Sequence, residues 1–210
     1  LPRTAGPEQL RRRLADGVPT SLDPDDAGWR YLSFRSLALA AGETVALPHP
    51  DREAVVVTIS GGVELVVDGA AEIVLPGRAS VFTGLPWAAY VPAHAGAALR
   101  GRPWAEGGRS VVAIGQAPPS GRPGVAAAPI LISPSDMAIE VRGRGPATRQ
   151  VTTIIAPDFP ADRLLACEVH TPAANWSGWP AHKHDVDDMP REAVLEETYL
   201  YQFRPVEGAF

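Results

Sequence analysis

The residues whose types and spacing best suit chemistry lie near the C-terminal end of the sequence. His182 and His184 are separated by one residue, and the run EETYLYQF begins at Glu196. Side chains two positions apart on a β-strand share a face, so both imidazoles can reach one cation at the roughly 2.0–2.1 Å of a Zn–N bond. On a helix the same spacing turns the two rings apart by about 200°. The pair therefore predicts a metal site provided that it lies on a strand.

The second run offers a carboxylate ligand for the same cation. If it is a strand, Glu197 shares a face with Tyr199 and Tyr201. Glu196 then faces the opposite way. One carboxylate and two phenols suit a polar cavity that holds a cation and a hydroxylated substrate. We therefore choose Glu197 over Glu196 as the ligand. The alternation of side chains alone does not say which face of the strand looks inward. Two histidines and one carboxylate leave coordination positions open, as in catalytic metal sites.

The elements that must position these residues have the pattern of short strands joined by turns. The 22 prolines and 20 glycines are spread singly along the chain. Gly61-Gly62 predicts a hairpin turn between two strands, and Asp68-Gly69 predicts another. Such spacing favours an antiparallel sandwich or barrel, and the order of strands and turns along the chain is typical of a cupin barrel. The predicted strands include residues 31–39, 54–59, 63–67, 73–75, 88–91, 111–114, 130–132, 139–141, 151–155 and 164–170.

A stretch with almost no charge, QAPPSGRPGVAAAP at residues 116–129, indicates a linker between two domains. We predict an N-terminal domain over residues 1–120 and, over 121–210, the linker followed by a metal-binding domain. His49 and His94 of the first half form no His-x-His pair. The first domain is therefore expected to carry no metal set.

Composition limits the classes of partner that the protein is expected to bind and the compartment in which it is expected to lie. The net charge is −5 and no basic run of the kind that binds nucleic acid or an anionic membrane is present. No apolar stretch reaches the roughly 18 residues that span a bilayer. A single cysteine, Cys167, permits no intrachain disulfide, which fits a reducing compartment. We expect a cytoplasmic protein that binds neither nucleic acid nor membrane.

Four segments carry a family resemblance. HKHD from His182 followed by LEETYLYQF, together with VRGRGPATRQV, NWSGWPAHKHD and DPDDAGWRYLSFRSLALAAGE, resembles bacterial 5-deoxy-glucuronate isomerases from about Ser21 to Phe203. A sister family, the 4-deoxy-threo-hexulose-uronate isomerases of pectin breakdown, shares the His-x-His plan. Its gap between the histidines and the glutamate is shorter than the one here.

The resemblance implies an all-β bicupin, with two antiparallel β-barrel domains and a metal held by three histidines and one glutamate. It assigns His182, His184 and Glu197 to the metal. The fourth ligand of such a site is a histidine on a later strand, so we expect the second cupin to be truncated in this chain. We also expect a divalent metal, zinc first with manganese or iron as alternatives, and a homo-oligomer.

The implied reaction is the aldose–ketose isomerisation of 5-deoxy-D-glucuronate in myo-inositol catabolism, through a metal-stabilised enediolate. Tyr199 and Tyr201 are candidates to shuttle protons, because a nearby metal lowers a phenol's pKa; packing with a hydrogen-bonded hydroxyl is their other role. Arg142 and Arg149, from the loop that also holds Arg144, are candidates to bind the substrate carboxylate.

The residues by themselves are also compatible with other functions. One is a different metal-dependent cupin enzyme, such as the uronate isomerase of pectin breakdown or a dioxygenase. Another is a non-catalytic cupin that binds sugar. The intact His182, His184 and Glu197 set argues against simple storage, and function inferred from fold alone would be analogy.

Overall fold

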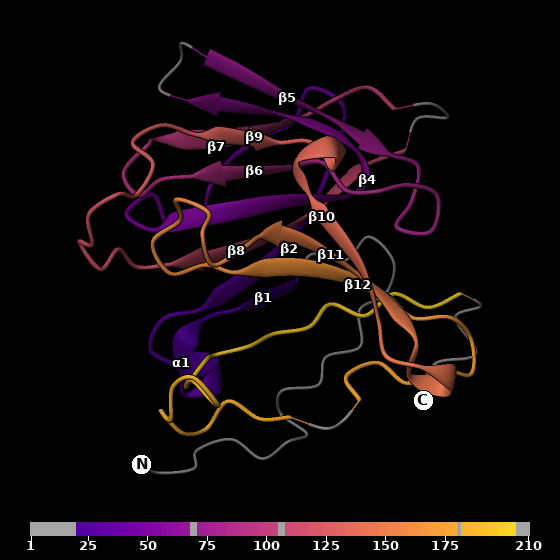
Figure 1. Cartoon of the computed structure of the whole chain (residues 1–210). Helices are drawn as coiled ribbons and strands as arrows, with labels where there is room; N and C mark the ends of the chain where they lie inside the picture. The colour runs from indigo at the N-terminus through magenta and orange to yellow at the C-terminus, as the bar shows by residue number, and fades with distance from the viewer. Residues whose placement is uncertain (1–19, 68–70, 105–107, 180–181, 205–210) are drawn as a thin grey trace.

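The computed structural model describes residues 20–67, 71–104, 108–179 and 182–204, and these residues form antiparallel β-sheets with very little helix (Figure 1). The strands of the larger sheet are β1 (Thr20–Leu22), β2 (Ser33–Leu39), β3 (Thr44–Ala46), β4 (Glu53–Val67), β5 (Ala71–Arg78), β6 (Ala88–Val91), β7 (Ala97–Gly101), β8 (Ser110–Ala117) and β9 (Ile130–Ile132). The all-β class predicted from the sequence is confirmed.

A smaller sheet and three short helical turns complete the described structure. The sheet has the order β10-β11-β12, with bounds Ala138–Arg142, Arg149–Ile155 and Ala166–His170. The helical turns are α1 (Pro24–Ala27) and the 3-10 turns Pro134–Asp136 and Gly145–Ala147. None of the helices in the described part of the chain is long and apolar enough to cross a membrane.

The long strand β4 joins the two layers of the larger sheet. Its residues 53–60 pair with β6 and β8, and its residues 61–67 pair with β5 and β7. The hairpin turn expected at Gly61-Gly62 is therefore wrong, because the strand continues through both glycines with a shift of register. A Cβ on Gly77, whose φ is +84°, would overlap the carbonyl group of Gly61. Glycine permits this close approach where the strand bends.

The first core fills the space between the two layers. Its members alternate along the strands, so that one face of each strand is apolar and buried. Val63, Leu65, Leu75 and Leu99 have no exposed surface. The buried members are Leu39, Leu47, Ala54, Val56, Val63, Leu65, Leu75, Ala89, Val91, Ala97, Leu99, Val112 and Ile114.

A second core joins the larger sheet to the smaller one. Val55 and Tyr90, on the outer face of the first half, belong to one buried cluster with Ile154, Ile155 and Leu164 from the second half. β9, which we expected to open the second domain, pairs with β6 and so extends the larger sheet. The two halves therefore share packed surface, and the domain division at residue 120 stays a prediction.

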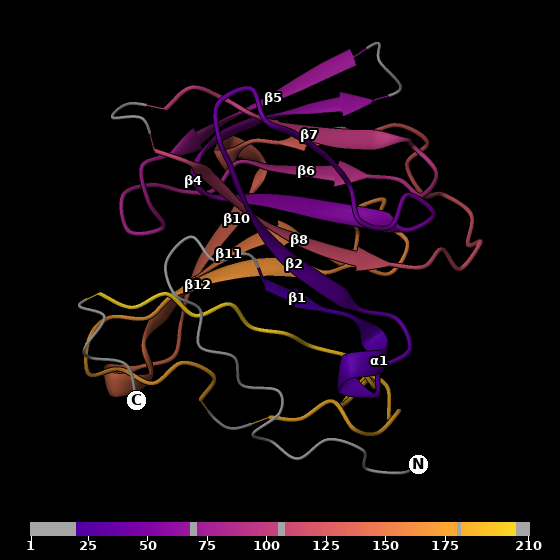
Figure 2. The same cartoon turned by 180° about the vertical axis from the view of Figure 1, so that it is seen from behind.

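The segment after β12 returns across the molecule to the N-terminal half. Its described residues, 171–179 and 182–204, contain no strand and make one isolated bridge, Asp188 with Glu192. Figures 1 and 2 both show its yellow C-terminal part running beside α1. This path brings the residues with the predicted chemistry next to residues 29–32.

Candidate metal centre

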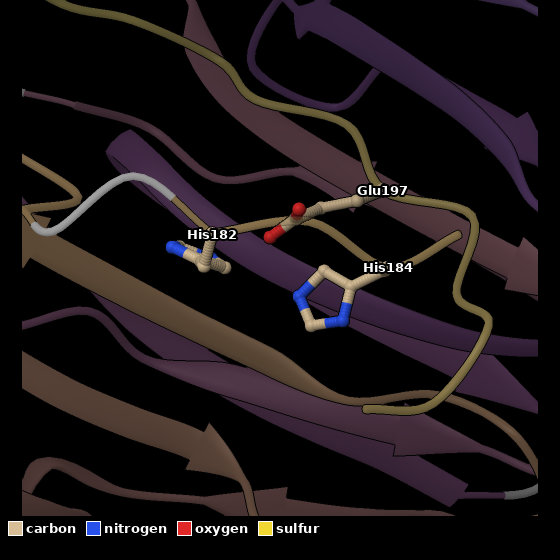
Figure 3. A group of neighbouring side chains, drawn as sticks. All are labelled: His182, His184 and Glu197. Atoms are coloured by element: carbon tan, nitrogen blue, oxygen red, sulfur yellow. The ribbon is translucent and has the colours of Figure 1, made fainter. Parts of the chain in front are cut away.

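The three predicted metal ligands lie together. One ligand atom each from His182, His184 and Glu197 falls within 4.8 Å of the other two. The two imidazole centroids are 5.3 Å apart and the ring planes stand at 82°. Figure 3 shows the Glu197 carboxylate and the two rings directed toward a shared space. The structure thus brings Glu197 beside two histidines that precede it by thirteen and fifteen positions in the sequence.

The backbone that carries these ligands is extended but is not part of a sheet. We expected strands at His182–His184 and from Glu196 to Tyr201, and neither is assigned as one. A strand requires a ladder of hydrogen bonds to a neighbour, and residues 182–204 make only the Asp188–Glu192 bridge. The strand assignment is therefore wrong, although consecutive side chains of this segment still point to alternate sides.

The alternation places two consecutive glutamates in different surroundings. Glu197 lines the same cavity as Tyr199 and Tyr201, as a period of two predicts. Glu196 turns away and accepts hydrogen bonds from backbone N–H groups of the N-terminal half. Parity alone left the choice between the two glutamates open, and the tertiary structure directs Glu197 toward the histidines.

The donor set suits a divalent metal. Two imidazole nitrogens and one carboxylate are ligands that zinc, manganese and iron accept in proteins. Nδ1 of His184 is shielded from solvent and has no hydrogen-bond partner among the described residues. A buried ring nitrogen without a partner is costly, and coordination would satisfy it. The residues present therefore fit a metal, whose identity the donor set leaves open.

An open cavity of about 500 Å³ surrounds these ligands, a volume within the range of small-molecule sites. Its lining mixes ligands, phenols and a tryptophan from the first half of the chain. The lining residues are Trp29, Ser177, Gly178, His182, Lys183, His184, Asp185, Leu195, Glu197, Tyr199 and Tyr201. The cavity is thus polar where the predicted ligands meet and aromatic beside them.

The two tyrosines form part of an aromatic row. The Tyr199 and Tyr201 rings stack at 5.7 Å between centroids, and Phe203 continues the row at 6.0 Å. Partial burial raises the pKa of Tyr199 above its ordinary value, and its hydrogen bond to Glu197 adds to the increase. The lowering expected beside a bound cation stays a prediction.

The two arginines predicted to bind substrate lie outside the cavity lining. Arg142 and Arg149 face each other as Cα partners at the end of the β10–β11 pair. Arg142 is 2.8 Å from the Glu140 carboxylate, and Nη1 of Arg149 donates to the carbonyl of Ala147 at 3.1 Å. Their role in binding a carboxylate stays a prediction. Lys183, which lines the cavity, pairs through Nζ with Glu192 at 3.0 Å.

Sequence reasoning missed two contributors to this site. Trp29 lines the cavity, and Glu192 accepts the backbone N–H groups of Asp185 and Val186, next to His184. Trp29 lies more than 150 positions before the histidines in the sequence. No pattern of neighbouring residues in the sequence predicts such a contact.

Comparison with known proteins assigns the family. The family profile of the KduI/IolB family matches residues 9–210. A protein of Geobacillus kaustophilus named 5-deoxy-glucuronate isomerase is 34% identical over 194 residues, which cover 92% of this chain and 67% of that protein. One of the same name from Halalkalibacterium halodurans is 32% identical and is covered to 72% of its length. The fold and donor set define a β-sheet protein with a candidate metal centre.

The chain belongs to the KduI/IolB family. Among solved structures, an IolB-like protein of Salmonella typhimurium LT2 superposes with a TM-score of 0.72 at 30% identity, over 83% of this chain and 64% of that one. The chain therefore spans about two thirds of the length of these relatives. The family recognised from the sequence and its cupin-like, all-β fold are confirmed, and the relatives' name supports the predicted isomerase class. The division into two cupin barrels stays a prediction.

Proposed function

We propose that this protein catalyses the aldose–ketose isomerisation of 5-deoxy-D-glucuronate to 5-dehydro-2-deoxy-D-gluconate in myo-inositol catabolism. The observation that carries the proposal is the meeting of His182, His184 and Glu197 at one edge of an open cavity. The relatives that share this chain's family are named for that isomerase activity. A small sugar acid fits the polar lining, and a homo-oligomer in the cytoplasm is the expected setting.

His182, His184 and Glu197 would hold a divalent metal, with zinc as the first choice and manganese or iron as the alternatives. When bound, the metal supplies Lewis-acid stabilisation of the negative charge that develops on the substrate oxygens. The three residues hold their donor atoms close together without requiring large rearrangement. Such preorganisation lowers the cost of stabilising charge as it forms.

The remaining work of the reaction is proton transfer between adjacent carbons, and the phenols are placed for it. The Tyr199 hydroxyl donates to Glu197 and can present a proton to a substrate in the cavity. Tyr201 stacks on Tyr199 and also lines the cavity. We assign Tyr199 to hold a proton at Oη beside the substrate and Tyr201 to orient it. Geometry of this kind, within hydrogen-bond reach, is what general acid–base catalysis requires.

Arg142 and Arg149 are proposed to bind the substrate carboxylate. A guanidinium pairs with a carboxylate through two parallel hydrogen bonds. The two side chains stand side by side on the β10–β11 pair, and Arg142 would exchange its contact with Glu140 for the substrate. Replacing each by glutamine is expected to raise KM more than it lowers kcat.

The test is proton NMR of 5-deoxy-D-glucuronate incubated with metal-loaded protein in D2O. Ketose that carries deuterium at the new CH2OH carbon would support isomerisation through an enediolate. Ketose without deuterium would keep the isomerase function and replace proton exchange with hydride shift or a shielded proton. Absence of turnover in protein shown to bind metal would reject the function.

Two variants separate the assigned roles in that assay. Tyr199→Phe removes the hydroxyl that donates to Glu197 and is expected to lower kcat by about 10²–10⁴-fold, the usual worth of general acid–base catalysis. Tyr31→Phe changes a phenol outside the cavity lining and serves as the matched control. Equal effects of the two substitutions would contradict the role of Tyr199.

A further inference from the structure

The carboxylate of Glu196 makes an unusual set of contacts with the other end of the chain. It accepts hydrogen bonds from three consecutive backbone N–H groups: Arg30 at 2.6 Å, Tyr31 at 2.8 Å and Leu32 at 2.7 Å. The partners are separated from Glu196 by more than 160 positions. Successive backbone N–H groups that converge on one point form an anion-binding concavity, and here the anion is a side chain of the protein itself.

The fold presents these amides next to the candidate metal centre. Gly28 ends α1 in the left-handed conformation at φ 67°, and the N–H of Trp29 donates to the carbonyl of Pro24. This turn directs the chain into β2, so the amides of residues 30–32 stand free of helix and sheet partners. Trp29, immediately before them, lines the cavity. The turn that follows α1 thus fixes the three amides and also places Trp29 in the cavity lining.

Consecutive side chains of an extended segment point to opposite sides. Because Glu196 is held on one side by three hydrogen bonds, the next residue, Glu197, is directed to the other side, where the two histidines lie. The segment has no sheet partner to hold it there. A further link, from the N–H of Leu195 to the carbonyl of His184 at 3.3 Å, joins the two ligand segments.

We propose that Glu196 is a positioning residue, which acts through Glu197 by tying the ligand-bearing segment to the amides of residues 30–32. The inference rests on the proposed metal centre and deepens it. Glu196 does not touch the metal in this proposal; its carboxylate sets where the carboxylate of Glu197 stands. The proposal also gives the N-terminal half, which is expected to carry no metal set of its own, a direct role in the site.

The charge of Glu196 matters as well as its shape. Hydrogen bonds from N–H groups to a carboxylate are shorter and about twice as strong as those to a neutral acceptor. Glutamine at this position keeps one oxygen but turns an NH₂ group toward an N–H donor. Glu196→Gln therefore loosens the anchor while nearly preserving the volume of the side chain.

The experiment measures metal affinity in purified protein, by competition between the protein and a chromogenic chelator for Zn²⁺ and for Co²⁺. Glu196→Gln is expected to weaken binding by 10–100-fold, the range found when a group behind a metal ligand is removed. Glu43→Gln is the matched control, because Glu43 also accepts a backbone N–H, from Ala40, and lies outside the cavity lining. The control should bind both metals as the native chain does.

A double-mutant cycle distinguishes positioning from general stability. If Glu196 acts through Glu197, its substitution has little further effect on metal affinity in a Glu197→Gln background. Glu196→Asp, which keeps the charge but shortens the reach, should recover part of the affinity. The visible spectrum of bound Co²⁺ should change in Glu196→Gln and should return toward that of the native chain in Glu196→Asp.

Several outcomes would overturn the inference. Native affinity and an unchanged Co²⁺ spectrum in Glu196→Gln would do so. Additive losses in the double mutant would do so too, since they would mean that Glu196 acts independently of Glu197. Failure of the native chain to bind metal would remove the metal centre and this inference together. Absence of isomerase activity with the expected affinity losses would reject the proposed reaction and leave the positioning role standing.

Discussion

Arg78 and Glu168 form a two-pronged ion pair that ties β5 of the larger sheet to β12 of the smaller one. Nη1 of Arg78 donates to Oε1 of Glu168 at 2.8 Å, and Nη2 reaches Oε2 at 2.5 Å. The arginine side chain is 3% exposed and also donates to the carbonyls of Thr58 and Gly84. The two sheets are therefore held together by charge as well as by the second core.

Glu168→Gln is expected to destabilise the protein by about 3–5 kcal/mol, because it leaves a buried arginine without its counter-charge. Urea denaturation followed by far-UV circular dichroism measures the loss. Glu43→Gln, which disrupts the exposed pair between Glu43 and Arg109, should cost no more than about 1 kcal/mol. Similar losses in both variants would contradict the structural role of the Arg78–Glu168 pair.

Glu53 is a second charged group at the junction of the two halves. Its carboxylate accepts the Tyr90 hydroxyl at 2.8 Å and the backbone N–H groups of Asp162, Arg163 and Leu164 at 2.7–2.9 Å. Burial, with help from Glu53, raises the pKa of Tyr90 above its ordinary value. The hydroxyl therefore remains a donor throughout the neutral range.

Tyr90→Phe is expected to lower the free energy of unfolding by about 1.5–3 kcal/mol, the worth of a hydrogen bond to a charged group. Chemical denaturation at neutral pH is the measurement. Tyr201→Phe alters an exposed phenol and should change stability by less than about 0.5 kcal/mol. Equal stability of the native chain and Tyr90→Phe would mean that the hydroxyl contributes nothing there.

Asp162 gives a pH dependence with a defined sign. Burial alone raises the pKa of its carboxyl, but hydrogen bonds from the Ser120 hydroxyl and N–H outweigh it, so the pKa lies below its ordinary 3.8. A carboxyl with a lowered pKa in the folded state stabilises the fold above its unfolded pKa. That stabilisation disappears as the pH falls through the folded pKa.

Asp162→Asn should therefore be less stable than the native chain at pH 6, and the difference should shrink as the pH falls below about 3.8. Urea midpoints of both proteins between pH 2.5 and pH 6 provide the comparison. A difference that stays constant over this range would show that the carboxylate's charge is not what stabilises the contact.

Removal of a proposed ligand should weaken metal binding at least as much as removal of a group behind it. His184→Ala is expected to lose 10–100-fold or more in Zn²⁺ affinity, and chelation should abolish isomerase activity until metal is restored. His94→Asn is a suitable control, since His94 lies outside the cavity lining and asparagine tolerates its φ of 65°. Undiminished Zn²⁺ binding by His184→Ala would remove this residue from the site.

Several features could be predicted because they depend on neighbours in the sequence. The strands at 54–59, 88–91, 111–114 and 151–155 were evident from runs of apolar and β-branched residues. Glycine turns were less reliable. Gly61-Gly62 has the composition of a hairpin turn, yet the strand runs through it, because a bend between packed layers needs the same small residue as a turn.

The candidate metal centre was predictable for the same local reason. The spacing of His182 and His184, and the alternation from Glu197 to Tyr201, follow from the geometry of an extended chain. That geometry holds whether or not a neighbouring strand is present, so the three side chains lie together although the strand assignment failed. Their role as metal ligands stays a prediction.

The sequence alone determined the fold class and a candidate ligand set: an all-β protein with a His-x-His pair and a glutamate. Tertiary structure alone decided that Glu196 meets the amides of residues 30–32, that Trp29 walls the cavity and that Arg78 reaches Glu168. Contacts between residues 90 or more positions apart depend on how strands pair and layers stack. Local spacing does not encode that choice, because the buried area and hydrogen bonds of the whole fold select it.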